Sequence, residues 1–447
     1  MSKVRFQDIV KQKDGFLRGP FGGDLKKDIF VEKSCDTYKV YEQGVVLNND
    51  ESIGRYYISN DYFKKKMYRF EVKPKDFLVS CSGVNYGAIH QLSENIEKGV
   101  INQALLRIRL DSEKVDDNYF YYLFKALIVN MIVGKKGDST IPNFPPLSVI
   151  KALEFELPEK DYQIQIGRLL SHLDNKIELN NRINAELETM AKTLYDYWFV
   201  QFDFPDDSPQ GQGKPYKTAG GKMVYNPTLK REIPLGWEVD TLASLIKSDK
   251  TGDWGKEEPE GNYTLQVDCI RGADINGLNG NGKINAPNRY ILQKNDHKLL
   301  APFDYVIEIS GGSPTQSTGR IAYITDDVLD RFTHPLICSN FCKAISLRNK
   351  DLFYCFAYLW NDLYDNGVLF GWEGKTSGIK NLLFDSFVTK HQVPIPPLGL
   401  AKQFFDFVAS LEQQKQTLLK ENVRLESLRD WLLPMLMNGQ VTVGEAS

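Results

Sequence analysis

Two long stretches of helical pattern stand 238 positions apart in this 447-residue chain, and they constrain its fold more than any other feature. The first begins at Leu157-Pro158 and runs through Tyr197, and the second begins at Ile395-Pro396 and runs to about Leu433. Apolar residues match at this single offset in the pairs Ile166 and Phe404, Leu170 and Val408, Leu187 and Leu425, and Leu194 and Leu432. A match that keeps its register over so many turns indicates an internal repeat.

Within each stretch, apolar residues recur at alternating steps of three and four positions. This is the pattern of a helix that buries one stripe against another helix. The residues expected to pack in these stripes are Leu173, Ile177, Leu187, Leu194, Leu411, Leu418, Leu425 and Leu432. Two stripes of equal length in one chain are most simply satisfied by each other, in antiparallel orientation. Asn180, Asn184 and Asn422 lie on or near them, either as buried groups that fix the register or as solvated positions.

The regions before the two helices also correspond. Asp76–Ser80 and Asp304–Ile307 both read as buried strands, and each is followed by a glycine-bearing loop, an aromatic helical run and a last strand. We therefore predict an α+β fold with a pseudo-twofold internal repeat, in which two similar α/β globules are separated by two long antiparallel coiled-coil helices. The predicted ranges are 1–156 and 235–394 for the globules, 157–201 and 395–438 for the helices, 202–234 for an irregular linker without a core of its own, and 439–447 for a tail.

The composition limits the class of protein. Hydrophobic residues make up 42% and charged residues 25%, the balance of a soluble globular protein. The net charge of −3 excludes binding of DNA by overall charge alone, so a partner would supply part of any positive surface. The six cysteines show no Cys-x-x-Cys pair and are expected to be free thiols. No signal segment and no bilayer-length apolar run is found, so we expect a cytoplasmic protein without membrane contact.

The motifs of nucleic-acid enzymes are not found in the sequence. An amino-methyltransferase needs a glycine-bearing donor loop and an Asn/Asp-Pro-Pro-aromatic turn that holds the flipped base. Asn143-Phe144-Pro145-Pro146 inserts one residue into that turn, and Asn226-Pro227-Thr228 lacks the second proline. The stretch Gly311–Gly319 lacks the lysine of a phosphate loop, and the five histidines are dispersed. We therefore expect no catalytic residue and no metal site.

Local motifs resemble those of the type I restriction–modification specificity subunits. Phe202-Asp203-Phe204-Pro205 and the stretch Arg231–Glu238 look like that family's link into its second recognition domain. Val393–Leu398 looks like its strand-to-helix transition, and Leu432–Gly439 looks like its C-terminal signature. The resemblance covers nearly the whole chain, and the order of the motifs is more specific than any one of them.

This resemblance implies a DNA-binding subunit that reads a bipartite, asymmetric site in double-stranded DNA, one half-site per globule. It implies as partners two modification subunits that methylate adenine N6, with motor-nuclease restriction subunits where cleavage of unmodified DNA is added. S-adenosylmethionine, and Mg²⁺ and ATP for restriction, would be bound by those partners and not by this chain.

Base reading requires Arg or Lys for guanine, Asn or Gln for adenine, and small hydroxyl groups, all projecting from loops on a rigid globule. The candidates in the first globule are Arg18, Lys26, Lys27, Ser82, Asn85, Tyr86 and Ser139. The candidates in the second globule are Lys250, Trp254, Ser313, Thr315, Gln316, Arg320, Lys375 and Lys380. Solvated surface is an equally good interpretation of any single one.

Two alternatives to a non-catalytic specificity subunit stay open at this point. One is a stand-alone methylase or nuclease with unrecognised motifs, which activity of the isolated chain would reveal. The other is a coiled-coil scaffold with two globules and no DNA role, which retention of a specific duplex by the assembled complex would exclude.

Overall fold

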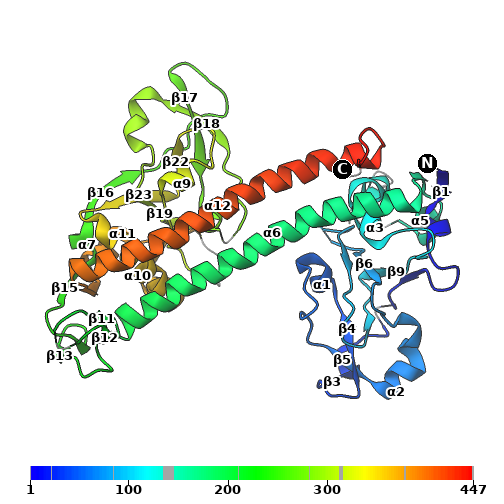
Figure 1. Ribbon diagram of the computed structural model, residues 1–447, viewed down its shortest axis with the longest axis horizontal. Coiled ribbons are helices and arrows are strands. Elements are labelled where there is room, and N and C mark those ends of the chain that lie inside the picture. The colour runs from blue at the N-terminus through cyan, green and yellow to red at the C-terminus, as the bar shows by residue number, and fades with distance from the viewer. Residues whose placement is uncertain are drawn as a thin grey trace. The chain divides into compact units, whose positions relative to one another are not determined.

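The computed structural model describes residues 2–444 except 22, 84, 134–144, 210, 281, 312–315 and 377–378; side chains are also not described at 132, 133, 375 and 376. The chain divides into two compact units, Met1–Ile177 with Arg424–Ser447 (unit 1) and Glu178–Val423 (unit 2). Helices and sheets mix in both units (Figure 1), which confirms the predicted α+β class.

Unit 1 is built on an antiparallel four-stranded sheet. Its strand order is β2 (Phe16–Arg18), β9 (Leu105–Ile108), β6 (Phe77–Ser80) and β7 (Ile89–Gln91). One face of this sheet is buried with the aromatic residues of α3 (Asp117–Leu123) and the following turn η5 (Phe124–Ile128). The other face contributes Leu78 and Leu105 to a second core that contains α1 (Gln43–Asn48). Alternate residues of these strands thus serve two cores, because side chains alternate between the faces of a sheet.

A second sheet of unit 1 has the order β3 (Phe30–Val31), β5 (Tyr57–Ser59), β4 (Thr37–Tyr41) and β8 (Gly99–Ile101), with β4 and β8 parallel. After β5 the chain forms the helical segment α2 (Asn60–Tyr62), η3 (Phe63–Met67) and η4 (Tyr68–Phe70). β1 (Ser2–Arg5) pairs antiparallel with β10 (Glu154–Leu157), the strand that leads into the first long helix. The remaining elements of unit 1 are η1 (Phe6–Ile9), η2 (Lys27–Ile29), α4 (Val129–Val133) and α5 (Leu147–Lys151).

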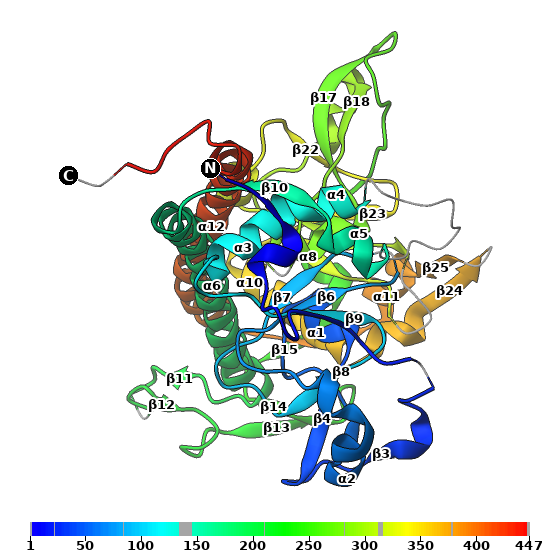
Figure 2. The ribbon, with the colours of Figure 1, turned by 90° about the vertical axis from the view of Figure 1, so that its right-hand side faces the viewer.

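Unit 2 repeats this topology. Its main sheet has the order β16 (Ile246–Thr251), β23 (Cys342–Leu347), β19 (Asp304–Glu308) and β21 (Ile321–Tyr323), again antiparallel. Its second sheet has the order β18 (Asn288–Leu292), β17 (Tyr263–Ile270) and β22 (Leu336–Cys338), with β17 and β22 parallel; Figure 2 shows β17 and β18 together. β15 (Glu238–Thr241) pairs with β26 (Gln392–Ile395) as β1 pairs with β10. The internal repeat therefore extends from the helices to the strand order of the main sheet and of three strands of the second sheet, while β3 has no counterpart in the second sheet of unit 2.

Two segments of unit 2 are more regular than the sequence indicated. The polar stretch Gly374-Lys375-Thr376-Ser377-Gly378, whose composition predicts a loop, begins inside a strand, because β24 (Glu373–Thr376) pairs with β25 (Ile379–Leu382), which also pairs with β20 (Ser310–Gly311). The stretch 202–234 forms two hairpins, β11 (Pro205–Asp206) with β12 (Lys214–Pro215) and β13 (Met223–Asn226) with β14 (Arg231–Pro234). Its Phe202 and Ile233 are buried with Trp237 in the core of unit 2, so this stretch shares that core.

The aromatic helix of unit 2 is α10 (Phe353–Asp365), and its buried face packs in the largest core of that unit. The other short elements of unit 2 are η6 (Asp196–Val200), α7 (Leu242–Leu245), η7 (Gly272–Asp274), α8 (Ile275–Leu278), η8 (Gln293–Lys298), α9 (Asp326–Leu329), η9 (Lys350–Leu352), η10 (Val368–Trp372) and α11 (Phe384–Lys390).

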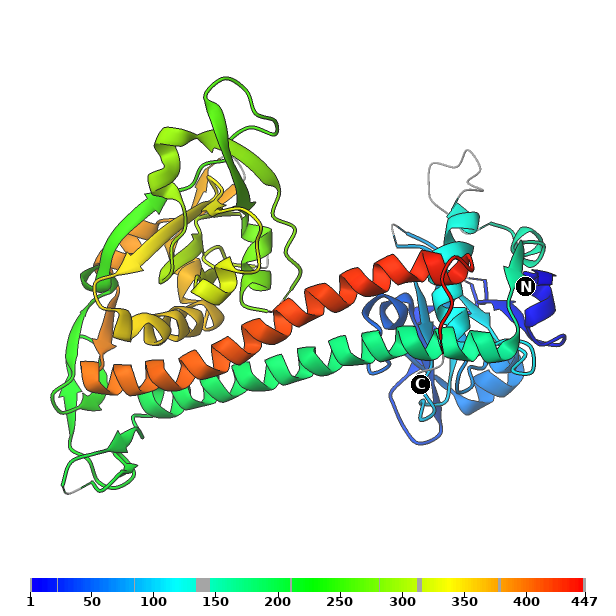
Figure 3. The same ribbon diagram turned by 45° about the horizontal axis from the view of Figure 1, so that its top comes forward.

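The two long helices are α6 (Lys160–Tyr195) and α12 (Leu398–Met437), whose first residues differ by the same 238 positions as the repeat (398 − 160). Each unit contains one part of both helices. In unit 2, Leu187 and Ala191 of α6 are buried with Val408 and Leu411 of α12, and Figure 3 shows the orange part of α12 beside the green end of α6. In unit 1, Ile166 and Leu170 are buried with Leu436 and Met437.

Three of the eight leucine and isoleucine positions expected in the stripes are buried, and five are half-buried. Ile177, Leu187 and Leu411 are buried, and the half-buried positions are Leu173, Leu194, Leu418, Leu425 and Leu432. In the turn of Leu418 the buried side chain is its neighbour Leu419. A straight helix has 3.6 residues per turn, so the side facing the partner drifts relative to a strict seven-residue repeat.

Candidate nucleic-acid interface

The loops of unit 1 that carry most of the candidate residues meet at one end of its main sheet. Arg18 at the end of β2 pairs with Leu106, and Ser80 at the end of β6 pairs with Leu105, so β2 and β6 finish where β9 begins. We call this edge, with Arg18, Ser80–Gly87 and Asn102–Leu105, the loop end of unit 1. At this loop end, burial raises the pKa of the Cys81 thiol to about 12. The positive charge of Arg18 acts to lower it.

The candidates at and near this loop end differ in their exposure and in their hydrogen bonds. Arg18 and Asn85 are exposed, as are Lys26 and Lys27 in the segment that follows β2. Ser82 is half-buried, and its carbonyl oxygen accepts a hydrogen bond from Gln43 Nε2 at 2.5 Å. The buried Tyr86 hydroxyl has no hydrogen-bond partner among the described residues. Ser139 lies outside them. The structure thus brings Arg18, Ser82 and Asn85 to one end of the sheet.

Two charged candidates of unit 2, Lys250 and Arg320, pair with buried acidic residues of their own unit. Lys250 Nζ lies 2.7 Å from the buried Asp304 carboxylate and also donates to the Leu299 carbonyl oxygen. Arg320 donates two hydrogen bonds to the buried Glu308 carboxylate, at 2.8 and 3.0 Å. Removing either cation would leave a buried carboxylate without its charge partner, which is strongly destabilising. These two side chains therefore have a structural role in unit 2, and base contact by them stays a prediction.

Of the remaining candidates of unit 2, Lys380 lies in the β24–β25 hairpin with Gln316 close to it, and Trp254 lies in the loop after β16. Lys380 Nζ lies 3.2 Å from a Glu373 carboxylate oxygen and 3.2 Å from the Gln316 carbonyl oxygen. Gln316 is exposed. Trp254 is half-buried, with the Arg289 guanidinium 4.1 Å from its ring centroid. Ser313, Thr315 and the side chain of Lys375 lie outside the described residues.

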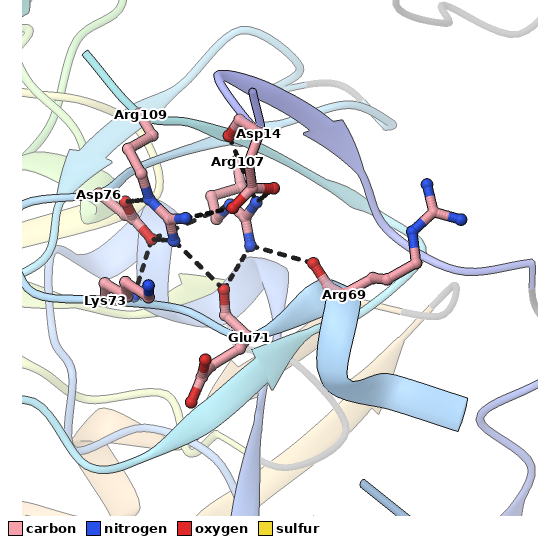
Figure 4. Close-up of polar contacts among 7 residues, drawn as sticks. All are labelled: Asp14, Arg69, Glu71, Lys73, Asp76, Arg107 and Arg109. Carbon is pink, nitrogen blue, oxygen red and sulfur yellow. Dashed lines mark hydrogen bonds and ion pairs between the residues drawn. The ribbon is translucent and has the colours of Figure 1, made fainter. Parts of the chain in front are cut away.

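A network of two buried arginines, the buried Asp76 and the exposed Asp14 was not among the candidates (Figure 4). Arg109, just after β9, holds Asp76 with two hydrogen bonds of 2.7 Å, and Arg107 and Arg109 both donate to Asp14. Arg107 is 1% exposed and also donates to the carbonyl oxygens of Arg69 and Glu71. The sequence signal is the alternation Leu106-Arg107-Ile108-Arg109, which places both arginines on one face of a strand.

This network is formally neutral, which suits the burial of Arg107, Arg109 and Asp76. Burial and the neighbouring Arg109 charge lower the pKa of Arg107, against the pull of Asp14 and Asp76. Burial also acts to lower the pKa of Arg109, but the hydrogen bonds to Asp76 and the negative charges of Asp76, Asp14 and Glu71 together outweigh burial, and the pKa is raised. Both guanidinium groups stay charged at neutral pH because arginine begins from so high a pKa. We interpret the network as a structural clamp between the strands of unit 1.

The clamp forms one wall of an open hollow of about 480 Å³. Its rim includes Tyr68 and the side chains of Arg69 and Lys73. Arg69 ends a basic run, since Lys64, Lys65 and Lys66 are exposed on the same helical segment, which Phe63 and Met67 anchor in a core of unit 1. Four exposed cations on one anchored segment are suited to contacts with DNA phosphates, which position a protein without reading sequence. The run Lys64-Lys65-Lys66 was the sequence signal for this surface.

The helix pair of unit 2 contains buried polar residues as well as apolar ones. Asn180 is fully buried and donates to Asn422 Oδ1 at 2.8 Å, and Asn422 donates to Asn181 Oδ1 at 2.8 Å. Further along, the buried Lys415 donates to Glu188 of α6 at 2.5 Å and to Glu412 at 2.7 Å. The residue numbers rise along α6 as they fall along α12, so the two helices are antiparallel here. Buried asparagine pairs of this kind fix the register of a helix pair.

The buried charges of this helix pair stabilise each other. Burial raises the pKa of the Glu412 carboxyl, and the Lys415 ammonium counteracts that shift. Burial acts to lower the pKa of Lys415, but Glu412 and Glu188 outweigh it and the pKa is raised. Lys415 is therefore charged at neutral pH and ties α12 to α6 within unit 2.

The described part of the chain contains no cluster of three or more His, Cys, Asp or Glu side chains that could hold a metal ion. Over the same residues, we find no helix with the length and apolarity to cross a membrane.

Comparison with known proteins supports a common architecture along nearly the whole chain. Residues 77–189 match the family model described as the type I restriction modification DNA specificity domain. The chain is 25% identical over 400 residues to the type I restriction enzyme MjaIX specificity subunit of Methanocaldococcus jannaschii, covering 88% of this chain and 84% of that protein. It is 24% identical over 458 residues to the HindI specificity subunit of Haemophilus influenzae, covering 94% and 98%.

A solved structure agrees at the level of the fold. The S subunit of a type I restriction–modification system from M. genitalium superposes with a TM-score of 0.56 at 17% identity, covering 97% of this chain and 95% of that one. The motifs of the sequence, the repeated topology and these matches identify the chain as a relative of the type I restriction–modification specificity subunits.

Proposed function

We propose that this chain is the sequence-specific DNA-binding subunit of a type I restriction–modification complex, with each unit reading one half of a bipartite, asymmetric site. The observation that carries the proposal is the repeated topology: the main sheets of the two units have the same strand order, and loops leave them at equivalent strand ends. A fold built twice, with different loop residues each time, is suited to reading two different half-sites. Base edges are read by side chains that project from such loops.

We further propose that the globules act as two separate readers and that α6 and α12 form an antiparallel coiled-coil spacer between them. The buried Asn180–Asn422 pair and the Lys415–Glu188 ion pair support this assignment, because both specify one register of the helix pair. In this proposal the helices also dock two modification subunits, and motor-nuclease subunits join where the complex cleaves DNA.

The chemistry is proposed to belong to the partners. S-adenosylmethionine would be bound by the modification subunits, and Mg²⁺ and ATP by the restriction subunits. This chain would contribute recognition and positioning alone, since its sequence contains neither a methyl-donor loop nor a base-holding catalytic turn.

The test is methyl transfer by the purified chain, by its cognate modification subunit, and by the two together, on DNA from a host strain that lacks the system. We expect adenine methylation from the pair alone, and sequencing of the methylated adenines should give one bipartite motif. Methylation or cleavage by the isolated chain would support the stand-alone enzyme instead. A pair that assembles but retains no duplex would support the scaffold without a DNA role.

A further inference from the structure

One exposed aromatic residue of unit 1 stands beside the loop end. Phe21 is 90% exposed, the highest value among the large hydrophobic side chains exposed in the described part of the chain. It lies three residues after Arg18 and five before Lys26, and both of these cations are exposed. An isolated exposed phenylalanine is ordinary on a protein surface, so its meaning depends on how its loop is held.

The loop that carries Phe21 is anchored on both sides. A side chain at Gly19 is impossible, because its Cβ would lie 1.7 Å from the Asn102 carbonyl oxygen, and the Gly19 amide donates to Leu105 at 2.9 Å. After Phe21, the Asp24 amide donates to the Phe21 carbonyl oxygen at 2.9 Å, and the Tyr62 hydroxyl donates to the Asp24 carbonyl oxygen at 2.7 Å. Hydrogen bonds thus hold the chain at Gly19 and at Asp24, on either side of the exposed Phe21.

Unit 2 has the same close approach of a glycine at the equivalent strand end, but the aromatic residue that follows lies in a different environment. Gly252 approaches Ser339 as Gly19 approaches Asn102, since a Cβ there would lie 2.0 Å from the Ser339 carbonyl oxygen. Two residues after this glycine stands Trp254, the counterpart of Phe21. Trp254 folds inward against the core of the second sheet, with Arg289 over its ring. The repeat therefore places an aromatic residue at this position in both units, and unit 1 alone leaves it in solvent.

We propose that Phe21 is a wedge that enters the DNA duplex bound by unit 1 and partly unstacks one base step. Phenylalanine is among the apolar side chains that DNA-binding proteins insert between base steps. Arg18, Lys26 and Lys27 are near Phe21 in the sequence and exposed, and in this proposal they contact phosphates or base edges close to such a step. Aromatic side chains stack on any base, so Phe21 would influence the geometry of the half-site rather than the base sequence that unit 1 reads. This inference rests on the proposed DNA-reading function.

The experiment uses the full chain assembled with its modification subunits and a duplex that contains the site found by sequencing methylated adenines. Phe21→Ala is compared with the wild type and with Tyr225→Ala, a control residue that is 62% exposed on the β13–β14 hairpin of unit 2. Affinity is measured for the target duplex, and 2-aminopurine is placed at successive positions of the half-site to report unstacking by its fluorescence. Thermal unfolding of each variant checks that the fold is unchanged.

We expect Phe21→Ala to weaken target binding by about ten- to hundredfold, the range for loss of one aromatic stacking contact. One 2-aminopurine position should brighten in the wild-type and Tyr225→Ala complexes and stay quenched with Phe21→Ala. Two results would overturn the wedge while leaving the proposed function intact. One is equal affinity of the Phe21→Ala and wild-type complexes for the duplex. The other is a loss of affinity in Phe21→Ala while no 2-aminopurine position brightens in the wild-type complex. A wild-type complex that binds no duplex overturns the proposed function, and the wedge with it.

Discussion

The two units share a strand order but fill it with different side chains, and the clearest case is the carboxylate that precedes the central strand. Asp76 in unit 1 and Asp304 in unit 2 stand at the same place, just before β6 and within the start of β19, and both are buried. Asp76 is held by Arg109, which follows β9, whereas Asp304 is held by Lys250 from β16, the equivalent of β2. Both units therefore pair this buried acid with a cation, which comes from the end of the adjacent strand in unit 1 and from the strand beyond it in unit 2.

The same freedom extends to the surface that follows the second sheet. After β5, unit 1 continues into a helical segment with Lys64, Lys65 and Lys66, while after β18 unit 2 continues into η8, which carries Lys294, Asp296 and Lys298. One unit thus presents a basic surface where the other presents a mixed one. The comparison teaches that the repeat conserves backbone and burial, while the charges and aromatic residues around it are free to specify different DNA contacts.

The largest effect should come from replacing one unit's globule. If each globule is a reader of its own, exchanging residues 1–150 for the equivalent domain of a relative should replace one half-site completely. The other half-site should remain, because the fold of unit 2 contains its own sheets and cores. Sequencing of methylated adenines in cells that carry the exchanged chain measures this. A simultaneous change in both half-sites would show that the units do not read DNA independently.

Next in size is the loss of the buried acid, which should affect the two units unequally. Asp76→Ala leaves two arginines, of which Arg107 is 1% exposed, without one of their partners, and we expect a loss of roughly 3–5 kcal/mol in the free energy of unfolding. Asp304→Ala leaves Lys250, whose side chain is 24% exposed and can reach water, and we expect roughly 1–3 kcal/mol. Denaturant unfolding of each variant measures the difference. Equal losses would mean that the cation's access to water does not set the cost.

How much of this was predictable from the sequence depends on how local each interaction is. The long helices were predictable because their apolar spacing is local, and both begin 238 positions apart as the repeat implied. The predicted correspondence between Asp76 and Asp304 matches the repeated strand order. The clamp was missed because its members come from residues 14, 76, 107 and 109, and no local pattern pairs a strand arginine with acids so far away in the chain.

The candidate site shows the same division. The sequence placed base-reading candidates on loops, and Arg18 and Asn85 are exposed at the loop end of unit 1. The sequence did not reveal that Lys250 and Arg320 face buried carboxylates, because the partners Asp304 and Glu308 lie 54 and 12 residues away. Phe21 and Trp254 occupy equivalent positions, yet only packing against the second sheet decides that one is exposed and the other half-buried.

A third and smaller effect concerns the polar residues of the helix pair in unit 2, which contrast with the apolar packing of Ile166 and Leu170 in unit 1. Asn180→Ala removes the hydrogen bond to Asn422 and should cost about 1–3 kcal/mol, because it leaves a buried acceptor without a donor. Asn184 is buried, and neither polar atom of its side chain has a hydrogen-bond partner among the described residues. Asn184→Leu should therefore be neutral or stabilising in the same unfolding measurement. If both variants lost stability equally, hydrogen bonding would not distinguish the two asparagines.

The smallest effect should come from the lysines that follow β5 in unit 1 and β18 in unit 2. Lys64, Lys65 and Lys66 of unit 1 are all exposed and lie beside Arg69, so their joint replacement by alanine removes up to three phosphate contacts. The logarithm of the binding constant falls against the logarithm of salt concentration with a slope of about 0.9 per phosphate contact, and we expect the triple variant to lower that slope by roughly 1–3. Specificity should be unchanged, because phosphate contacts carry no sequence information.

The control is the double variant Lys294→Ala with Lys298→Ala in η8 of unit 2, where Asp296 already reduces the local positive charge. The salt slope of this control should change by less than about 1. Titration of the assembled complex with target and unrelated duplexes at several salt concentrations measures both slopes. An equal change in the two variants would mean that the charge difference between the units has no part in DNA binding.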